Sequence, residues 1–94
     1  MNVRFDHLVK VLLSLYNGEM KGETPPTVSE FVDRIGISRS VFFMRLRRKL
    51  EEAGLVEFRV NPDRTITVHL TEKGRKLAEC LKKCEDILKE IGIV

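Results

Sequence analysis

The most constraining feature of this sequence is the stretch from residue 31 to residue 54, which reads FVDRIGISRSVFFMRLRRKLEEAG. An apolar cluster before Gly36 predicts a short helix, and Ser38 is a residue type that caps the start of the next one. Glycine permits the left-handed backbone that a tight turn between two helices requires. The stretch therefore predicts a helix, a turn and a second helix that ends at Gly54.

The second predicted helix has an apolar face and a basic face. At about 100° per residue, its apolar positions fall within roughly 60° of Leu46 and predict a buried stripe. The members of this stripe are Phe42, Phe43, Leu46, Leu50 and Ala53. The opposite side carries Ser40, Val41, Met44, Arg47 and Arg48, with Arg45 on its flank.

The positive charge of the chain is concentrated on this same helix. The formal net charge is +3, yet residues 37–50 contain five basic residues and no acidic one. Like charges one turn apart repel each other on a helix, whereas a merely solvated face usually alternates in sign. An anionic partner is the favoured interpretation, and an arginine-rich face that contacts only water is the alternative.

One further helix is expected before this stretch, and the short helix that ends at Gly36 has a predicted start. Periodic apolar residues predict a first helix over residues 4–16, ended by Asn17 and Gly18. Thr27, with Glu30 three residues later, has the form of a capping box for the helix that stops at Gly36.

A β-hairpin is predicted after Gly54. Apolar and polar residues alternate with period two in residues 55–60 and 65–70, on both sides of the turn-forming sequence Asn61-Pro62-Asp63-Arg64. The exposed face and tip are expected to carry Arg59, Arg64 and Thr65, and His69 is expected to be solvated. Arg64 either adds charge to a binding surface or forms a turn pair with Asp63.

A long last helix is predicted from Thr71, which is expected to cap it. Apolar positions spaced four, three, four and three give a heptad pattern over about two repeats. These positions are Leu77, Leu81, Cys84, Leu88 and Ile91. Some twenty helical residues span about 30 Å, so the distal half is expected to project beyond a small core. We expect a second copy of the chain to cover it in a symmetric dimer, and packing within one chain is the alternative.

The two cysteines, Cys80 and Cys84, lie four residues apart on this helix. They are expected to be small apolar residues in a packed seam, because a zinc site needs four ligands and no second pair is nearby. A symmetric partner chain that completes a four-thiolate site or a disulfide is the other interpretation.

Composition bounds the remaining possibilities. The 94 residues predict one compact unit, with residues 1–70 as a binding domain and residues 71–94 as a dimerisation helix. No apolar run approaches the roughly 18 residues that span a bilayer, so we expect a cytoplasmic protein. The sequence lacks Gln and is rich in Lys, Glu and Arg, which hints at a thermophilic source.

Catalysis is not expected, and neither is a cofactor or metal. His7 and His69 stand alone, and the sequence has no local nucleophile and base pair and no glycine-rich phosphate loop. The predicted fold class is mainly α with a small β-hairpin (α+β).

Three motifs carry a resemblance to a known family. IGISRS at residues 35–40, LEEAGLVE at 50–57 and LTEKGRKLAE at 70–79 resemble the MarR-type and PadR-type transcriptional regulators. In size the chain is similar to small archaeal DNA-binding proteins that pair through a C-terminal coiled coil. The resemblance covers roughly residues 5–80 and implies a winged helix-turn-helix with a long C-terminal dimerisation helix.

By this resemblance, helix 38–53 would enter the major groove of double-stranded DNA, and a wing at residues 59–65 would lie near the minor groove or the backbone. Arg45 and Arg48 are expected to contact bases or phosphates, and Arg39 and Arg47 phosphates. Further expected contacts are Ser40 to a phosphate, and Arg59 and Arg64 from the wing. Val41 and Met44 are expected to touch either thymine methyl groups or a neighbouring chain.

Three functions remain open from the sequence. The first is a dimeric, sequence-specific regulator of transcription. The second is a winged-helix protein–protein interaction module, because fold does not determine function. The third is an architectural protein that binds DNA of any sequence. A small-molecule effector is neither indicated nor excluded.

Overall fold

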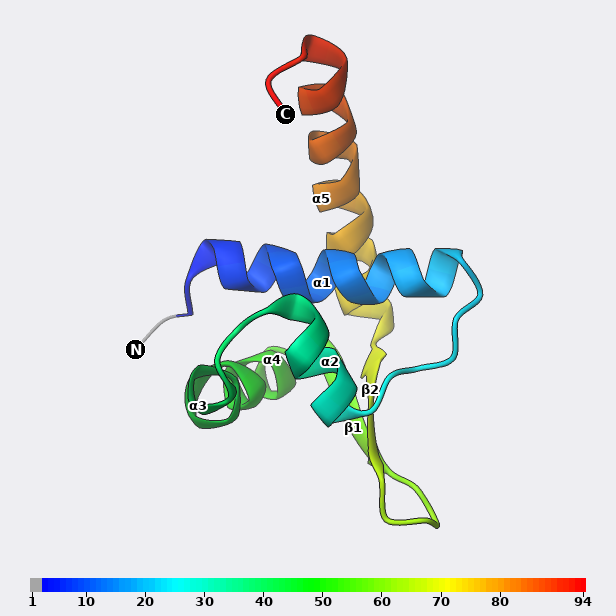
Figure 1. Ribbon diagram of the computed structural model, residues 1–94. Helices are drawn as coiled ribbons and strands as arrows, with labels where there is room; N and C mark the ends of the chain where they lie inside the picture. The colour runs from blue at the N-terminus through cyan, green and yellow to red at the C-terminus, as the bar shows by residue number, and fades with distance from the viewer. Residues whose placement is uncertain (1–2) are drawn as a thin grey trace.

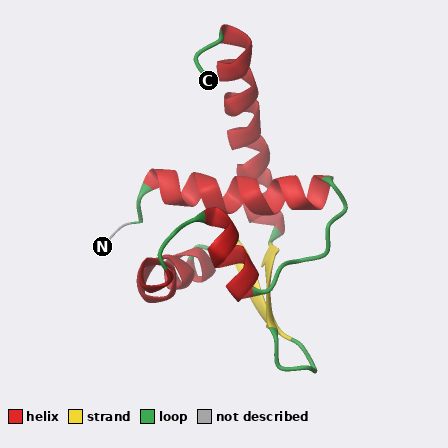
Figure 2. Ribbon diagram, viewed as in Figure 1, coloured by secondary structure: helices red, strands yellow, loops and turns green. Residues whose placement is uncertain are grey.

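The computed structural model describes residues 3–94 and shows five α-helices, one π-helical turn and a two-stranded sheet within that range. The helices are α1 (Phe5–Met20), α2 (Val28–Ile35), α3 (Arg39–Val41), α4 (Arg47–Glu52) and α5 (Glu72–Ile91), with the π-helical turn at Phe42–Leu46 between α3 and α4. The strands are β1 (Val56–Val60) and β2 (Ile66–Leu70). The expected class, mainly α with a small β-hairpin, is confirmed (Figure 2).

The elements are arranged around α1. Figure 1 shows α1 crossing the base of α5, with α2, α3 and α4 packed on the other side of α1. The tip of the hairpin and the far end of α5 point away from α1 in opposite directions (Figure 1). The hairpin tip and helices α2 to α4 therefore lie on one side of α1, and the far half of α5 lies on the other (Figure 1).

One apolar core joins the helices to the hairpin. Its largest fully buried side chains are Phe31, Phe42, Leu12, Leu46, Leu50, Val11, Val32 and Val68. The rings of Phe31 and Phe42 meet edge to face, with their centroids 6.2 Å apart. No buried side-chain nitrogen or oxygen in residues 3–94 lacks a hydrogen-bond partner, so no polar side chain of the described interior is left uncompensated.

The helix boundaries follow the expected caps at three places. The hydroxyl of Thr27 accepts a hydrogen bond from the Glu30 amide, and that of Ser38 accepts one from the Val41 amide, both at 3.2 Å. Thr71 caps α5 by accepting from the Gly74 amide at 3.0 Å. Gly36 ends α2 in the left-handed conformation at φ 69°.

The first helix is longer than expected. Asn17 and Gly18 were expected to end it, but α1 continues to Met20. The extra turn brings Glu19 to Arg75 of α5, whose guanidinium donates two hydrogen bonds to the carboxylate at 2.8 and 2.9 Å. A contact between residues so distant in sequence outweighs the weak helix propensity of Gly18.

The hairpin forms with the expected antiparallel pairing, and each strand starts one residue later than predicted. Val56 pairs with Leu70, and Val60 pairs with Ile66. The apolar face is not buried along its whole length, because Val60 near the tip is 75% exposed. The loop before α2 adds to the sheet, since the Val68 amide donates to the Pro26 carbonyl at 3.0 Å.

Residues Gly54–Leu55 and Thr71–Gly74 form what we call the hairpin–α5 junction. The Thr71 hydroxyl donates to the Gly54 carbonyl, and the Thr71 amide donates to the Leu55 carbonyl at 3.1 Å. The ammonium group of Lys73 donates to the Ala53 carbonyl at 2.9 Å. The start of α5 is thereby tied directly to the end of α4.

Gly74 allows this close approach. It is buried inside the first turn of α5, and a Cβ placed on it would overlap the Leu55 carbonyl oxygen. No other residue type has a hydrogen in place of that carbon. The glycine of the LTEKGR motif is therefore required by the close packing at the hairpin–α5 junction.

From Leu77 to its end, α5 leaves apolar side chains uncovered. Leu77, Ile87, Leu88 and Ile91 are exposed, and Cys80 and Cys84 are free and exposed. The expectation that the cysteines pack in a seam is therefore wrong for the single chain. Leu81 differs from the other expected dimerisation residues, because it packs partly against the core beside α1.

We predict that Gly74→Ala destabilises the fold, although alanine normally stabilises a helix interior. The new methyl group would force the junction apart and lower the free energy of unfolding by about 2–3 kcal/mol. Urea denaturation measures this loss. Gly18→Ala is the matched control, because a Cβ there would meet only the flexible end of Glu23. That variant should gain roughly 0.5–1 kcal/mol, and equal effects of the two changes would contradict the role of Gly74.

We predict a pH-dependent loss of stability in Glu19→Gln. Hydrogen bonds from Arg75 lower the pKa of Glu19 below its usual value. The ion pair therefore stabilises the fold at any pH above the usual pKa of a glutamate. This contribution is lost as the pH falls through the lowered pKa. Water screens the partly exposed pair, so the expected loss is about 1 kcal/mol or less. Melting temperatures should differ between wild type and variant at pH 7 and converge towards pH 3; a constant gap would contradict this assignment.

Candidate nucleic-acid interface

The candidate interface is built on the helical segment that follows Gly36. Ile37 is buried and anchors the turn, and Ser38 starts the new helix. The segment then runs without a break through α3, the π-helical turn and α4, and ends before Gly54 at φ 71°. The predicted helix over residues 38–53 is therefore present, but it is not α-helical throughout.

The π-helical turn changes which side chains are buried. The Arg47 amide donates to the Phe42 carbonyl, five residues back, so this turn is wider than an α-helical turn. Phe42, Leu46 and Leu50 are buried, as predicted. Phe43 and Ala53 were also expected to be buried, but Phe43 is 40% exposed and Ala53 is exposed. The wide turn rotates the helix surface away from the phase of an ideal α-helix.

Most of the expected contact residues lie on the surface. Arg39, Ser40, Met44, Arg45 and Arg48 are exposed, and so are Arg59 and Arg64 of the hairpin. Val41 was expected to point outward but is half-buried against the core. Its contact with a thymine methyl group stays a prediction, as do the other base and phosphate contacts.

The arginines of this helix are not free of acidic neighbours, contrary to the sequence-based expectation of mutual repulsion. Arg39 pairs with Asp33 at 3.0 Å, and Arg48 pairs with Glu52 at 3.0 Å. A longer contact of 3.7 Å joins Arg47 to Glu51. The Arg48 side chain is 83% exposed, and exposed ion pairs contribute at most about 1 kcal/mol. The guanidinium groups of Arg39 and Arg48 are therefore held loosely and remain accessible to a stronger anion.

Two basic residues of the helix have no ion-pair partner in residues 3–94. Arg45 and Lys49 are exposed, and no carboxylate of the described chain lies within 4 Å of their charged groups. Lys49 was not singled out from the sequence, although it contributes to the local excess of positive charge. Arg45 lines a hollow of about 200 Å³ with Arg4 and His7 at the start of α1.

Arg47 is anchored against the hairpin. Its guanidinium lies 4.9 Å from the centre of the Phe58 ring on β1, a cation–π contact that fixes the side chain between helix and wing. An open groove of about 420 Å³ lies beside it, lined by Arg47, Phe43, Arg64 and the start of α2. Phe43 was assigned to the core from the sequence, and no local pattern reveals that it instead lines this groove.

The tip of the hairpin is held by side-chain hydrogen bonds. Asp63 accepts hydrogen bonds from the amide of Thr65 at 3.0 Å and from its hydroxyl at 2.6 Å. These bonds lower the pKa of Asp63. The predicted alternative of an Asp63–Arg64 turn pair is not present in the described chain. Arg64 instead has φ 71°, a left-handed conformation that places a charged residue at the turn at some cost in backbone energy.

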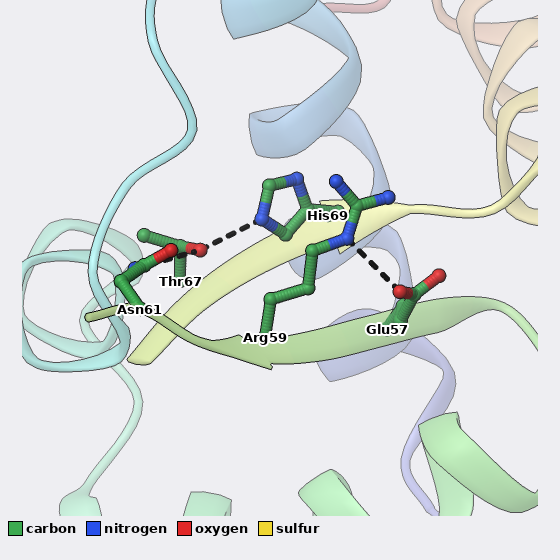
Figure 3. Close-up of polar contacts among 5 residues, drawn as sticks. All are labelled: Glu57, Arg59, Asn61, Thr67 and His69. Atoms are coloured by element: carbon green, nitrogen blue, oxygen red, sulfur yellow. Dashed lines mark hydrogen bonds and ion pairs between the residues drawn. The ribbon is translucent and has the colours of Figure 1, made fainter. Parts of the chain in front are cut away.

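The outward face of the hairpin carries a row of polar contacts, drawn in Figure 3. Arg59 donates to Glu57 at 2.9 Å on β1, and on β2 the Thr67 hydroxyl lies 2.7 Å from His69 Nε2. His69 was expected to be solvated, but it is half-buried. Burial and, secondarily, the nearby Arg59 charge lower its pKa, which favours the neutral ring.

Two other kinds of site are absent from the described residues. Between residues 3 and 94, no cluster of three or more His, Cys, Asp or Glu side chains is placed to hold a metal ion. In the same range, no helix combines the length and apolar character needed to cross a bilayer.

Comparison with known families accounts for this arrangement. The family model for the ArnR1-like winged-helix domain matches residues 1–88. The chain belongs to this ArnR1-like winged-helix family. The winged helix-turn-helix expected from the sequence motifs is thereby confirmed, with α2 to α4 as the helix-turn-helix and the β1–β2 hairpin as the wing.

Solved structures of other winged-helix proteins are similar to the ArnR1-like chain. AF1382 from Archaeoglobus fulgidus superposes with a TM-score of 0.77 at 24% identity, over 92% of this chain and 91% of that one. A proposed DNA-binding protein from Ralstonia eutropha JMP134 gives a TM-score of 0.67 at 31% identity, over 84% and 98% of the two chains. MepR of Staphylococcus aureus, solved in complex with DNA, gives a TM-score of 0.72 at 22% identity, over 95% of this chain and 65% of that one.

Among proteins with curated functions, none matches the sequence. The ArnR1-like family match gives the winged-helix fold, which the chain shares with MepR, a transcription regulator of Staphylococcus aureus. Winged-helix transcription regulators are not enzymes, which agrees with the absence of a catalytic motif in the sequence.

Proposed function

We propose that this ArnR1-like chain is a dimeric regulator of transcription that binds a specific sequence of double-stranded DNA. In this proposal helix 38–53 enters the major groove, and the wing at residues 59–65 lies near the minor groove or the backbone. The observation that carries the proposal is the placement of exposed arginines on the helix and on the wing at the same end of the molecule.

The chemistry of the exposed side chains supports this binding mode. The major groove is wide enough for a helix, and an arginine fork can bind O6 and N7 of one guanine. Arg45 and Arg48 are the candidates for such base contacts, and Met44, which is 80% exposed, offers an apolar contact for a thymine methyl group. Arg39, Ser40 and Arg47 are candidates for phosphate contacts that fix the orientation on the duplex.

The wing would add a second contact to the same duplex. Arg64 lines the groove beside Arg47 and Phe43. Arg59 adds a second positive charge on the outward face of the hairpin. MepR, which has the same fold, is solved bound to DNA. That complex supports the general mode of binding and not a particular contact.

The dimer would form through α5. The exposed side chains of Leu77, Cys84, Leu88 and Ile91 give this helix an apolar face, and Leu81 continues it towards the core. In a twofold dimer the two recognition helices can address successive major grooves, about 34 Å apart. A palindromic binding site is the consequence, and a cytoplasmic location follows for a regulator of this kind.

We predict that Arg48→Ala weakens DNA binding and leaves the melting temperature nearly unchanged. The side chain is exposed and its ion pair with Glu52 is weak, so its loss costs little stability. Loss of one base or phosphate contact should lower affinity roughly 5- to 100-fold, as for a contribution of about 1–3 kcal/mol. Fluorescence anisotropy with duplexes selected from a random library measures the affinity, and thermal denaturation measures the stability.

Lys83→Ala is the matched control for this variant, because it removes the same charge from the exposed surface of α5. It should bind DNA like the wild type. Unaltered affinity in Arg48→Ala, or equal losses in both variants, would contradict the proposed interface. Binding that is insensitive to salt would instead favour a protein-interaction module, since phosphate contacts make affinity fall steeply with salt. Binding without a preferred sequence would favour an architectural role.

We predict that Arg64→Gly separates stability from binding at the wing. Glycine adopts φ 71° without the strain that a side chain experiences there, so the melting temperature should stay equal or rise. DNA affinity should fall and its salt dependence should become shallower by about one charge. Arg64→Lys is the control that keeps both the charge and the strain, and wild-type affinity in the glycine variant would remove Arg64 from the interface.

A further inference from the structure

The exposed apolar surface of α5 is a narrow stripe with the two cysteines inside it. At about 100° per residue, its members lie within an arc of roughly 100°. They are Leu77, Cys80, Cys84, Ile87, Leu88 and Ile91, and all six are exposed. Between Gly74 and Ile91 no charged residue falls within this arc. We call these six residues the α5 stripe.

A neighbouring face of α5 is already occupied within the chain. Gly74 and Ala78 are buried at the contact with the junction and α1, and Leu81 packs partly against the core. Lys82 pairs with Glu85 at 3.0 Å and with Asp86 at 3.5 Å beside this contact. The α5 stripe lies next to that face and projects with the helix beyond α1 (Figure 1).

The apolar pattern of α5 is symmetric about Cys84. Leu77 and Ile91 lie seven residues to either side of it, Cys80 and Leu88 four, and Leu81 and Ile87 three. A second α5 running antiparallel therefore places an apolar side chain opposite each apolar side chain of the first. This self-complementarity identifies a second copy of the chain as the occupant of the α5 stripe. The inference that follows rests on the dimer proposed above.

Cys84 faces Cys84 of the other copy whichever way the second helix runs. In an antiparallel pair, full overlap of the stripes places residue 84 opposite residue 84 of the other copy. In a parallel pair with the twofold axis along the helices, every residue faces its own counterpart. Cys84 meets its counterpart in both arrangements, whereas Cys80 does so only in the parallel one.

A disulfide within one chain is excluded by the helix itself. Side chains four residues apart on a helix have Cβ atoms about 5–6 Å apart, whereas a disulfide needs about 3.5–4.5 Å. Cys80 and Cys84 lie inside the uninterrupted helix α5, so they cannot pair without unwinding it. Oxidation to a disulfide therefore requires a thiol from another molecule.

We propose that Cys84 residues of two copies form an interchain disulfide when a peroxide is present, and that this bond locks the dimer. One Cys84 thiolate attacks hydrogen peroxide, the O–O bond breaks, a sulfenic acid forms, and the hydroxide that leaves takes up the proton released by the thiol to become water. The second Cys84 thiolate attacks the sulfenic sulfur, the S–O bond breaks, and hydroxide leaves and is protonated to water. Two thiols and one hydrogen peroxide yield one disulfide and two waters.

The consequence of the bond is a dimer that no longer dissociates on dilution. Two DNA-binding units joined covalently bind the second half-site at an effective concentration set by their geometry, not by the concentration of protein. The oxidised regulator would thus occupy a palindromic site at protein concentrations at which the reduced dimer dissociates.

The test compares wild type, Cys84→Ser and Cys80→Ser after removal of reductant and treatment with hydrogen peroxide. The apolar pattern that is symmetric about Cys84 favours the antiparallel pair, in which Cys80 does not face its counterpart. On a non-reducing denaturing gel, wild type and Cys80→Ser should therefore run at twice the 10.9 kDa mass of the chain, and Cys84→Ser should run as a monomer. After dilution, oxidised wild type and Cys80→Ser should stay dimeric, and Cys84→Ser should dissociate like the reduced protein. Cross-linking of Cys84→Ser to the wild-type extent, or none in wild type, would overturn the proposal.

Sedimentation of all three proteins in reductant separates this proposal from the dimer on which it rests. Reduced dimers that do not cross-link would overturn the disulfide and leave the α5 dimer standing. Reduced protein that stays monomeric at every concentration would overturn both. Serine is close to cysteine in size and both positions are exposed, so the fold of each variant should be retained, as a thermal melt checks.

Discussion

The close approach of α5 to Leu55 is the constraint on which the rest of the structure depends. Gly74 lets the helix backbone touch the Leu55 carbonyl, and Thr71 and Lys73 donate hydrogen bonds to the carbonyls of residues 53–55. The end of the recognition helix, the root of the wing and the start of α5 are thereby held by one set of contacts. The surface proposed to read DNA and the surface proposed to join two copies consequently belong to a single rigid body.

Much of this architecture was predictable because it depends on local chemistry. The caps at Thr27, Ser38 and Thr71 need only a hydroxyl at the right distance from an amide. The hairpin register follows from period-two alternation around a turn, since a slip of one residue would expose the buried face. The family motifs at residues 35–40, 50–57 and 70–79 combine these local signals, and the winged-helix fold followed from them.

The failures arose where distant contacts or an irregular backbone decided the outcome. No pattern near Asn17 and Gly18 shows that Arg75 stabilises another turn of α1. An ideal helical wheel cannot predict the π-helical turn, so it assigned Phe43 to the core. The candidate arginines were identified from their charge alone. Their acidic partners were missed because Asp33 lies on another helix and because Glu51 and Glu52 follow the basic segment 37–50.

The acidic partners of Arg39 and Arg48 give the interface an internal competitor. A guanidinium that turned its whole fork towards a nucleic acid would give up a carboxylate that the protein itself supplies, and that carboxylate would then face the approaching phosphates. A duplex that offers only diffuse negative charge gains little from this exchange, whereas one that presents a well-oriented pair of acceptors gains more. Discrimination between duplexes would then come partly from the protein's own glutamates and aspartate, which make poorly matched sequences less favourable without contacting a single base.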